Sequence, residues 1–195
     1  LVVAELALFN FEINSAPLLL ESGALQTMHD DLFARWRRCE ATAATMDLRP
    51  LMTGILPTVR AADLSPASMS PMERYRAIDE QIFRLRRGKP VLIDISGAEH
   101  LVHEHNDVML ESATTSLQIH VEVDAAEAAR AFNVCKMISA ITVGASANSP
   151  FLFGRQLWQE TRIPLFEQAV AVGGSDYSKR VTFGVRYAQQ SILEC

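Results

Sequence analysis

The stretch Ser116-Leu-Gln-Ile-His-Val-Glu122 alternates strictly between polar and apolar residues. Successive side chains of a β-strand point to opposite faces, so this pattern predicts a strand with one core face and one polar face. The polar face would carry an imidazole, an amide and a carboxylate side by side (Ser116, Gln118, His120 and Glu122). Such a set can hold a divalent cation or a zwitterionic ligand. We therefore expect a binding face here, with an ordinary solvated strand face as the alternative.

A second strand is predicted near the start of the chain, over residues 6–14 (Leu-Ala-Leu-Phe-Asn-Phe-Glu-Ile-Asn). This strand would carry Glu12 among apolar neighbours. A carboxylate in apolar surroundings is costly unless a cation or a hydrogen-bond donor compensates it. Glu12 is therefore expected to have a partner.

Composition narrows the class of protein. The chain has 195 residues, of which 49% are hydrophobic and 21% charged, which predicts one globular domain over residues 1–195 and excludes disordered and fibrous classes. Eighteen basic and 23 acidic residues give a net charge of -5, without the basic excess typical of nucleic-acid binding. Three cysteines without a CxxC motif, no signal peptide and no bilayer-long apolar run predict a reduced cytoplasmic protein with no membrane partner.

Several helices and strands are expected from periodicity. Residues 24–46 repeat apolar residues at helical spacing, with Phe33 and Trp36 in the expected core stripe. A buried strand is expected within residues 49–58, and a further strand that ends at Gly97 is expected at residues 91–96. Between them, a capping box formed by Ser70 and Glu73 is expected to begin a helix that ends near Arg87.

The second half of the chain predicts a further helix over residues 125–145, capped by Asp124. This helix is apolar on all sides, so we expect it to be buried between layers. A turn at residues 148–150, a helix beyond Pro164 and a strand at residues 180–184 complete the expected order.

The connection over residues 98–107 is rich in potential metal ligands (Glu99, His100, His103, Glu104 and His105). A metal site is one interpretation of this stretch, although the spacing matches no fixed motif such as HExxH, and the role of the three histidines stays open. A polar hairpin tip is the alternative.

Six motifs occur together along the chain: Glu5 and Glu12 in residues 5–14, Gly54-Ile-Leu-Pro-Thr58, Arg74-Tyr75, Thr115-Ser-Leu-Gln-Ile-His120, Ala147-Asn-Ser-Pro150 and Leu157-Trp-Gln-Glu-Thr-Arg162. In combination they resemble the glutamate–cysteine ligase superfamily, specifically its second bacterial type, the carboxylate-amine ligases. The resemblance covers nearly the whole chain and is strongest over residues 111–162. It implies an α+β fold of the glutamine-synthetase type, in which a curved antiparallel sheet forms a funnel and helices pack on its back.

The resemblance also implies a reaction. ATP phosphorylates a carboxylate to give an acyl phosphate, and an amine then attacks to form an amide of the gamma-glutamyl type, with glutamate and cysteine as the default pair of glutathione biosynthesis. Mg2+ would be held at positions matching Glu5, Glu12 and His120. Since Glu5 lies seven residues before Glu12, a regular strand places the two on opposite faces, so Glu5 serves only if a bulge or the strand's start intervenes.

Substrate contacts are implied at two further residues. Gln118 would contact the amino-acid substrate or metal-bound water. Arg162 matches a catalytic arginine that holds a substrate carboxylate or the transferred phosphoryl group bidentately. The expected partners are therefore small molecules, namely an amino acid, an amine and ATP, and the oligomeric state stays open.

Two departures from the family pattern leave other interpretations open. A Gly-x-Glu-x-Glu strand does not precede Leu1, and a late metal-binding strand is not visible. We therefore expect the chain to be a central piece of the catalytic domain, inactive or poorly active alone. The alternatives are a non-catalytic ligase-like protein that binds a small amino acid or nucleotide, and a structural or oligomerisation module.

Overall fold

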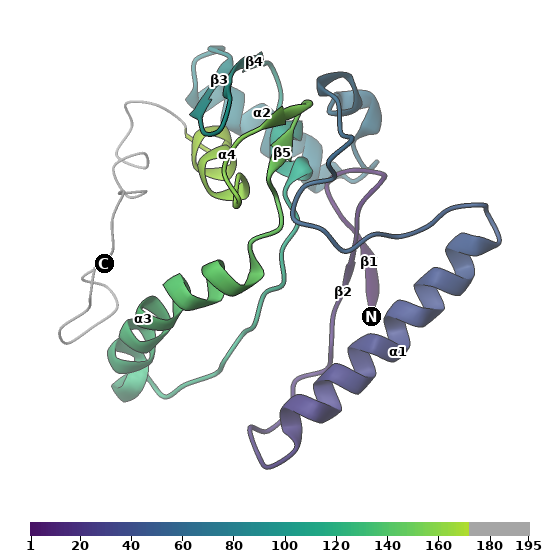
Figure 1. The fold of residues 1–195 in the computed structure, drawn as a ribbon, viewed down its shortest axis with the longest axis vertical. Coiled ribbons are helices and arrows are strands. Elements are labelled where there is room, and N and C mark those ends of the chain that lie inside the picture. Colours follow the sequence, from purple (N-terminus) through teal and green to yellow (C-terminus); the bar gives the residue numbers. More distant parts are fainter. Residues whose placement is uncertain (172–195) are drawn as a thin grey trace.

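Residues 1–171 are described by the computed structural model of this protein (Figure 1). The strand expected at residues 180–184 lies outside this range. The helices and strands are, in order, β1 (Val2–Ala4), β2 (Phe11–Ile13), α1 (Ala24–Ala44), α2 (Glu73–Leu85), β3 (Val91–Ser96), β4 (His100–His105), α3 (Ala128–Ser146), β5 (Phe151–Leu152), β6 (Arg155–Gln156) and α4 (Arg162–Ala169). The strands form three separate two-stranded antiparallel sheets among the described residues, so the class is α+β as predicted.

The core lies at one end of the molecule, around the β3–β4 hairpin (Figure 1). Alternate residues of β3 face inward (Val91, Ile93 and Ile95). They pack with Leu165 of α4 and with Met109 and Leu110 of the 3-10 helix η3 (Val108–Ala113), all of which are buried. Strict alternation over six residues is the pattern of a half-buried strand, and the predicted strand at residues 91–96 is confirmed to the residue.

The prediction of one strand over residues 6–14 is wrong, because these residues contain a turn. β1 and β2 form a hairpin in which Val3 pairs with Glu12. Leu6 and Ala7 leave the hairpin and enter the core, where Ala7 bridges to Met69. The turn continues through Leu8 and Phe9, which are exposed. An apolar run can therefore be a partly buried turn as well as a strand, and periodicity alone does not separate the two.

Ser70 does not cap α2 as predicted. The helix begins at Glu73 with Met72 at its N-cap, and no side chain caps it. The Ser70 hydroxyl instead donates a hydrogen bond to the Glu5 carbonyl, and its N–H donates to the Leu6 carbonyl at 2.8 Å. Ser70 thus holds the start of the turn between β1 and β2.

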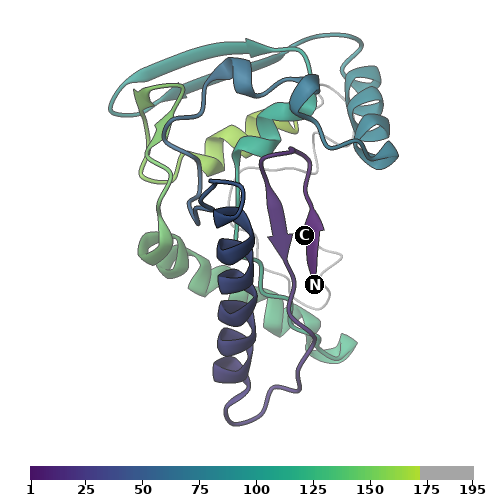
Figure 2. The same ribbon diagram turned by 90° about the vertical axis from the view of Figure 1, so that its right-hand side faces the viewer.

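Both long helices extend away from the core (Figures 1 and 2). α1 forms almost where it was predicted, but none of its residues is buried and Phe33 is exposed. Trp36 has partial cover, since its ring stacks on Phe11 at 6.4 Å between centroids. The core stripe expected for this helix is therefore only partly covered among the described residues.

The predicted burial of α3 is wrong. None of its residues is buried, and the side chain of Ile141 is 75% exposed. Asp124 does not cap it, because a 3-10 turn at Ala125–Glu127 precedes the helix. Despite the apolar character of α3, no helix in residues 1–171 combines the length and hydropathy of a membrane span.

Two other predicted strands are not formed. Residues 49–58 run as a loop with Gly54 and Ile55 buried. Residues 114–124 contain no regular element, and Leu117 is 79% exposed. A strand needs a neighbour to satisfy its backbone groups, and no described strand pairs with this segment.

Conversely, the connection over residues 98–107 contains strand β4. β4 pairs along its whole length with β3, so that His103 lies opposite Ile93 and His105 opposite Val91. The hairpin tip is held against the end of β6: Glu99 N–H donates to the Gln156 carbonyl at 2.8 Å. Gly97 fits this close approach because it has no side chain.

We expect Gly97→Ala to destabilise the protein by about 1–3 kcal/mol, because a new methyl group forces backbone apart. A Cβ at this position would lie 2.5 Å from the Leu157 carbonyl carbon. Urea unfolding measures the loss. Gly144→Ala is the matched control: nothing lies within 4 Å of its Cβ, and in a helix interior alanine gains about 0.5–1 kcal/mol over glycine. Equal stability of Gly97→Ala and the wild type would contradict the packing described.

Candidate active site

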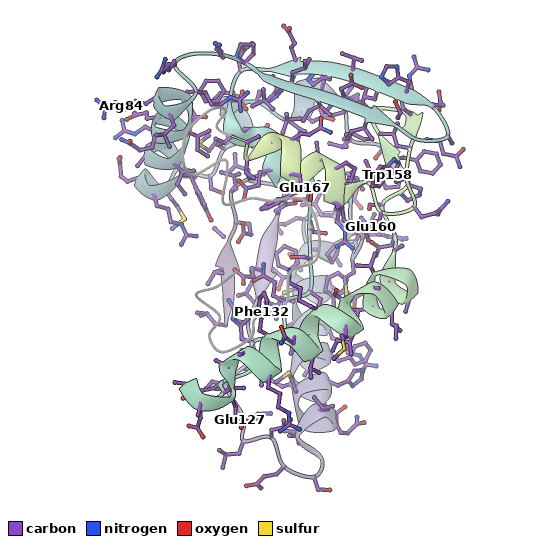
Figure 3. The ribbon with its side chains drawn as sticks, turned by 90° about the vertical axis from the view of Figure 1, so that its left-hand side faces the viewer. Arg84, Glu127, Phe132, Trp158, Glu160 and Glu167 are labelled. Carbon is purple, nitrogen blue, oxygen red and sulfur yellow. The ribbon has the colours of Figure 1, made fainter. Side chains whose placement is uncertain are left out.

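Four segments that are distant in sequence meet in one polar cluster, here called the junction (Thr53–Gly54, Thr115, Asn148–Ser149 and Glu160–Arg162). In Figure 3, Glu160 lies between α4 and α3, where the chain passes from the exposed helix back to the core. All four segments come from motifs that carry the family resemblance. The junction is therefore the part of the described structure where those motifs converge.

The centre of the junction is an ion pair between Glu160 and Arg162. The Arg162 guanidinium donates from Nε to Oε1 and from Nη2 to Oε2 of Glu160, both at 2.6 Å. The two side chains are 21% (Arg162) and 9% (Glu160) exposed. Bidentate pairs of this kind are the strongest hydrogen-bonded ion pairs in proteins. They lower the pKa of Glu160, although burial acts in the opposite direction, and raise that of Arg162.

Ser149 ties this pair to the turn that follows α3. Its hydroxyl donates to Oε1 of Glu160 and accepts from the Arg162 backbone N–H at 3.3 Å. Its backbone continues the contact, since Ser149 N–H donates to the Gln159 carbonyl and Thr161 N–H donates to the Ser149 carbonyl, both at 3.1 Å. Ser149 and Thr161 are fully buried, so none of these groups depends on water for a partner.

Gly54 lies close to the ion pair of Glu160 and Arg162. A Cβ on Gly54 would collide with the Asn148 amide oxygen and lie 2.8 Å from Nε of Arg162. The neighbouring Thr53 hydroxyl lies within 3.3 Å of the Asn148 carbonyl, to which it donates. A larger residue here would therefore force the side chains of Asn148 and Arg162 to move.

Thr115 closes the junction. Its N–H donates to the Gly54 carbonyl at 2.9 Å, and its hydroxyl donates to the Thr53 carbonyl. Its own carbonyl accepts from Nη1 of Arg162. Arg162 thus uses three of its five side-chain N–H groups, two on Glu160 and one on Thr115.

Arg162 is the one predicted site residue that lies in the junction. Gln118 and His120 lie just beyond Thr115, in the exposed segment without regular structure. Glu12 lies on β2 and is also exposed. Glu5 lies at the start of the turn between β1 and β2, where its carboxylate accepts from the Leu6 N–H at 3.0 Å. The expectation that Glu5 and Glu12 lie on opposite faces of one strand therefore does not apply, since no continuous strand joins them.

The described residues do not assemble the predicted metal ligands. Carboxylate and imidazole groups are suitable ligands for Mg2+, but no group of three or more His, Cys, Asp or Glu side chains within residues 1–171 is placed to hold a metal ion. The donor types of Glu5, Glu12 and His120 fit Mg2+, whereas their arrangement in the described structure does not. Their role as ligands stays a prediction.

Glu111 was not predicted as a site residue. It lies on η3 with its carboxyl group half-buried. Burial raises the pKa of Glu111, and the negative charge of Glu5 raises it further. Glu111 falls in the region of strongest family resemblance, but nothing in its local sequence indicates that it would lie near Glu5, because the contact depends on the turn between β1 and β2.

The three histidines near β4 have separate surroundings. His100 hydrogen-bonds Asp94 at 2.8 Å on the surface, and His105 hydrogen-bonds Asp107 at 2.7 Å in the core. His103 packs edge-on against Phe153, with ring centroids 4.9 Å apart. Burial, and to a smaller extent the charge of His105, lowers the pKa of His103. The predicted metal site is not formed among the described residues, and the polar hairpin is what the structure shows.

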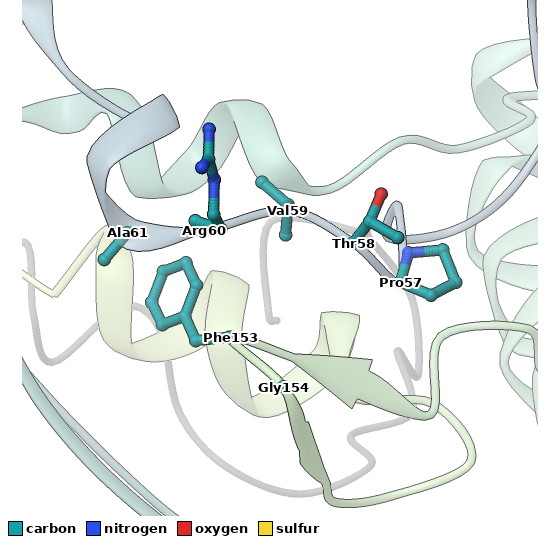
Figure 4. Close-up of a pocket in the computed structure, with 7 residues that line it drawn as sticks. All are labelled: Pro57, Thr58, Val59, Arg60, Ala61, Phe153 and Gly154. Carbon is teal, nitrogen blue, oxygen red and sulfur yellow. The ribbon is translucent and has the colours of Figure 1, made fainter.

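A cavity of about 290 Å3 lies beside the β5–β6 turn (Figure 4). Its lining combines the loop at residues 57–61 with Phe153 and Gly154. Its one charged side chain, Arg60, is already paired with Asp63 at 2.8 Å. The cavity contains none of the predicted site residues, so it does not take the place of the junction as the candidate site.

The junction predicts a pH-dependent loss of stability. The pKa of Glu160 is lowered in the folded state. The stabilisation that its carboxylate gives to the fold is therefore complete above the pKa of the unfolded chain, about 4.3, and disappears as the pH falls through the folded pKa. At pH 7, Glu160→Gln should cost about 2–4 kcal/mol, since it leaves a partly buried arginine without its counter-charge. Urea unfolding measured from about pH 7 down to about pH 3.5 should show that the stability difference between the wild type and Glu160→Gln shrinks below the unfolded pKa.

Glu99→Gln is the control for this experiment. Glu99 pairs with Arg155 at 2.9 Å, but both side chains are exposed, so water replaces the lost contacts and the loss should be smaller at every pH. A wild-type advantage over Glu160→Gln that stays constant down to the lowest pH would contradict the assigned pairing.

Comparison with known proteins gives a family. The family model described as glutamate-cysteine ligase family 2 matches residues 1–174. Searches of curated proteins and of solved structures found no match. The family match covers most of the chain and includes all the junction residues, so the chain belongs to glutamate-cysteine ligase family 2, a family of ligases.

Proposed function

We propose that this chain forms part of an ATP- and Mg2+-dependent ligase that joins an amino-acid carboxylate to an amine, with glutamate and cysteine as the default pair. One observation supports this most: the family motifs at residues 54, 115, 148–149 and 160–162 meet in a single junction. The segment that carries Gln118 and His120 begins there. The larger fold that we propose is a glutamine-synthetase-like domain with a curved antiparallel sheet. The proposed location of the protein is the cytoplasm.

The proposed reaction has two steps. The substrate carboxylate attacks the γ-phosphorus of ATP, which releases ADP and leaves an acyl phosphate. The amine nitrogen then attacks the acyl carbon, loses a proton and expels phosphate. Both steps move negative charge through phosphoryl oxygens, which cationic groups must stabilise. Mg2+ would supply part of that positive charge.

Chain residues are assigned to these needs as follows. Glu5, Glu12 and His120 are proposed to hold Mg2+, and Gln118 to contact the amino acid. Arg162 has two N–H groups that no described residue uses, and these are proposed to hold a substrate oxygen. The partial exposure of the Arg162 side chain supports this, because a ligand could reach it.

A second candidate function is a ligase-like protein that binds a small amino acid or nucleotide without catalysis. The observation that favours it is the dispersed arrangement of Glu5, Glu12 and His120 in residues 1–171. Catalysis needs these groups assembled around one reaction centre, whereas binding through Arg162 and its neighbours does not.

Calorimetric titration with ATP in the presence of Mg2+, followed by glutamate, tests the proposal. We expect Mg2+-dependent binding by the full chain and a loss of about tenfold or more in the Glu12→Ala, His120→Ala double variant, since replacing even the residues that hold metal ligands in place weakens metal binding by about that factor. The control is the His29→Ala, Glu40→Ala double variant, which removes the same residue types from α1 and should bind as the wild type does.

Three outcomes are informative. Equal binding by the two double variants would contradict the assigned ligands. Release of ADP in the presence of glutamate and cysteine would contradict the non-catalytic candidate. The absence of binding by the wild-type chain would contradict the proposed function for this chain.

A further inference from the structure

Thr115 is the last firmly held residue before the proposed ligand-binding positions. No backbone hydrogen bond holds residues 116–123 within the described structure, and these residues are exposed. The next backbone hydrogen bond along the chain joins Glu127 N–H to the Asp124 carbonyl at 2.9 Å. Gln118 follows Thr115 by three residues, a reach of roughly 10 Å in extended chain. The anchoring of Thr115 therefore determines where this segment starts and which way it leaves the core.

Three contacts anchor Thr115, and they have different origins. Two use the carbonyl groups of Thr53 and Gly54. The third is the hydrogen bond from Nη1 of Arg162 to the Thr115 carbonyl. The same Arg162 side chain lies against Gly54, so it supports the first two contacts as well as making the third.

Arg162 can do this only if its guanidinium keeps one orientation. A free arginine side chain populates many rotamers, and fixing them costs roughly 2 kcal/mol of conformational entropy. Glu160 fixes the guanidinium plane with two parallel hydrogen bonds of 2.6 Å, and Ser149 in turn holds the Glu160 carboxylate. Glu160 itself is buried, and within the described structure Arg162 is the one proposed ligand-binding residue that it contacts.

We propose that Glu160 is a positioning residue: it orients Arg162, which holds the Thr115 carbonyl and thereby sets the path of the segment that carries Gln118 and His120. This inference rests on the proposed function for the role of those two residues, but its structural part does not. The competing explanation is that the pair only stabilises the fold.

Two variants separate positioning from stability. Glu160→Gln leaves Arg162 partly unpaired. The Glu160→Gln, Arg162→Met double variant removes both charges, and such replacements of a buried pair are often neutral for stability. We therefore expect the double variant to be more stable than Glu160→Gln, but to keep a Thr115 amide that exchanges about tenfold faster than in the wild type, because the contact to its carbonyl is lost.

NMR on the full chain measures this difference. Amide hydrogen exchange reports on Thr115, and 15N relaxation reports on residues 116–120, which should become more mobile in both variants. The Glu99→Gln, Arg155→Met double variant is the control, since it removes a similar pair that does not contact Thr115. Wild-type exchange at Thr115 and wild-type relaxation at residues 116–120 in the double variant would overturn the proposal and leave a purely stabilising pair.

Binding of ATP with Mg2+ tests the functional part. Glu160→Gln keeps Arg162 present, so an approximately tenfold weaker binding, with Glu99→Gln unchanged, would support positioning. Faster exchange at Thr115 together with wild-type affinity would overturn it, because the path of the segment would then have no effect on the ligand. If the wild-type chain does not bind ATP, the proposed function fails, and the NMR result alone decides whether Glu160 positions Thr115.

Discussion

An ion pair that is largely removed from water is stable only when every member has its partners, and the pair of Glu160 and Arg162 imposes this condition on the structure. Leaving one such charge unpaired costs several kcal/mol. Because Ser149, Gly54 and Thr115 complete the environment of this pair, the turn after α3, the loop before Ile55 and the end of η3 must all reach the same place. One interaction thus fixes segments that are separated by more than 100 residues, from Thr53 to Arg162.

The two long helices lie outside this constraint. α1 and α3 contain no buried residue among those described, whereas the elements around β3 and α4 form the core. The spacing of apolar residues determined which helices form, and their limits were predictable within a few residues. Spacing does not determine what packs against an apolar face, and this is why the burial expected for Phe33 and Ile141 was not observed.

The same distinction between local pattern and packing applies to the predicted strands. β3 was predictable as a short, mostly apolar run that ends at Gly97, and alternate residues of this run are buried on one face. Residues 116–122 alternate just as clearly, but alternation fixes only the two faces of a strand, and pairing requires a neighbour from elsewhere in the chain. The turn at Leu6 and Ala7 was missed for a related reason: a turn and a strand can have the same apolar composition, and the contact of Ser70 with Glu5 that distinguishes them is not local in sequence.

Of the predicted site residues, Arg162 alone lies in the junction, and the carboxylate that balances its charge was not predicted. Arg162 was expected to hold an anionic substrate, yet Glu160 already neutralises it. A neutralised arginine still supplies N–H donors but little net attraction for a phosphoryl group, since the field of its charge is compensated within about 3 Å. Transfer of a phosphoryl group here would therefore depend on a second source of positive charge. That requirement makes Mg2+ necessary to the proposed reaction, and it makes the orientation of the remaining donors on Arg162 more important than the charge itself.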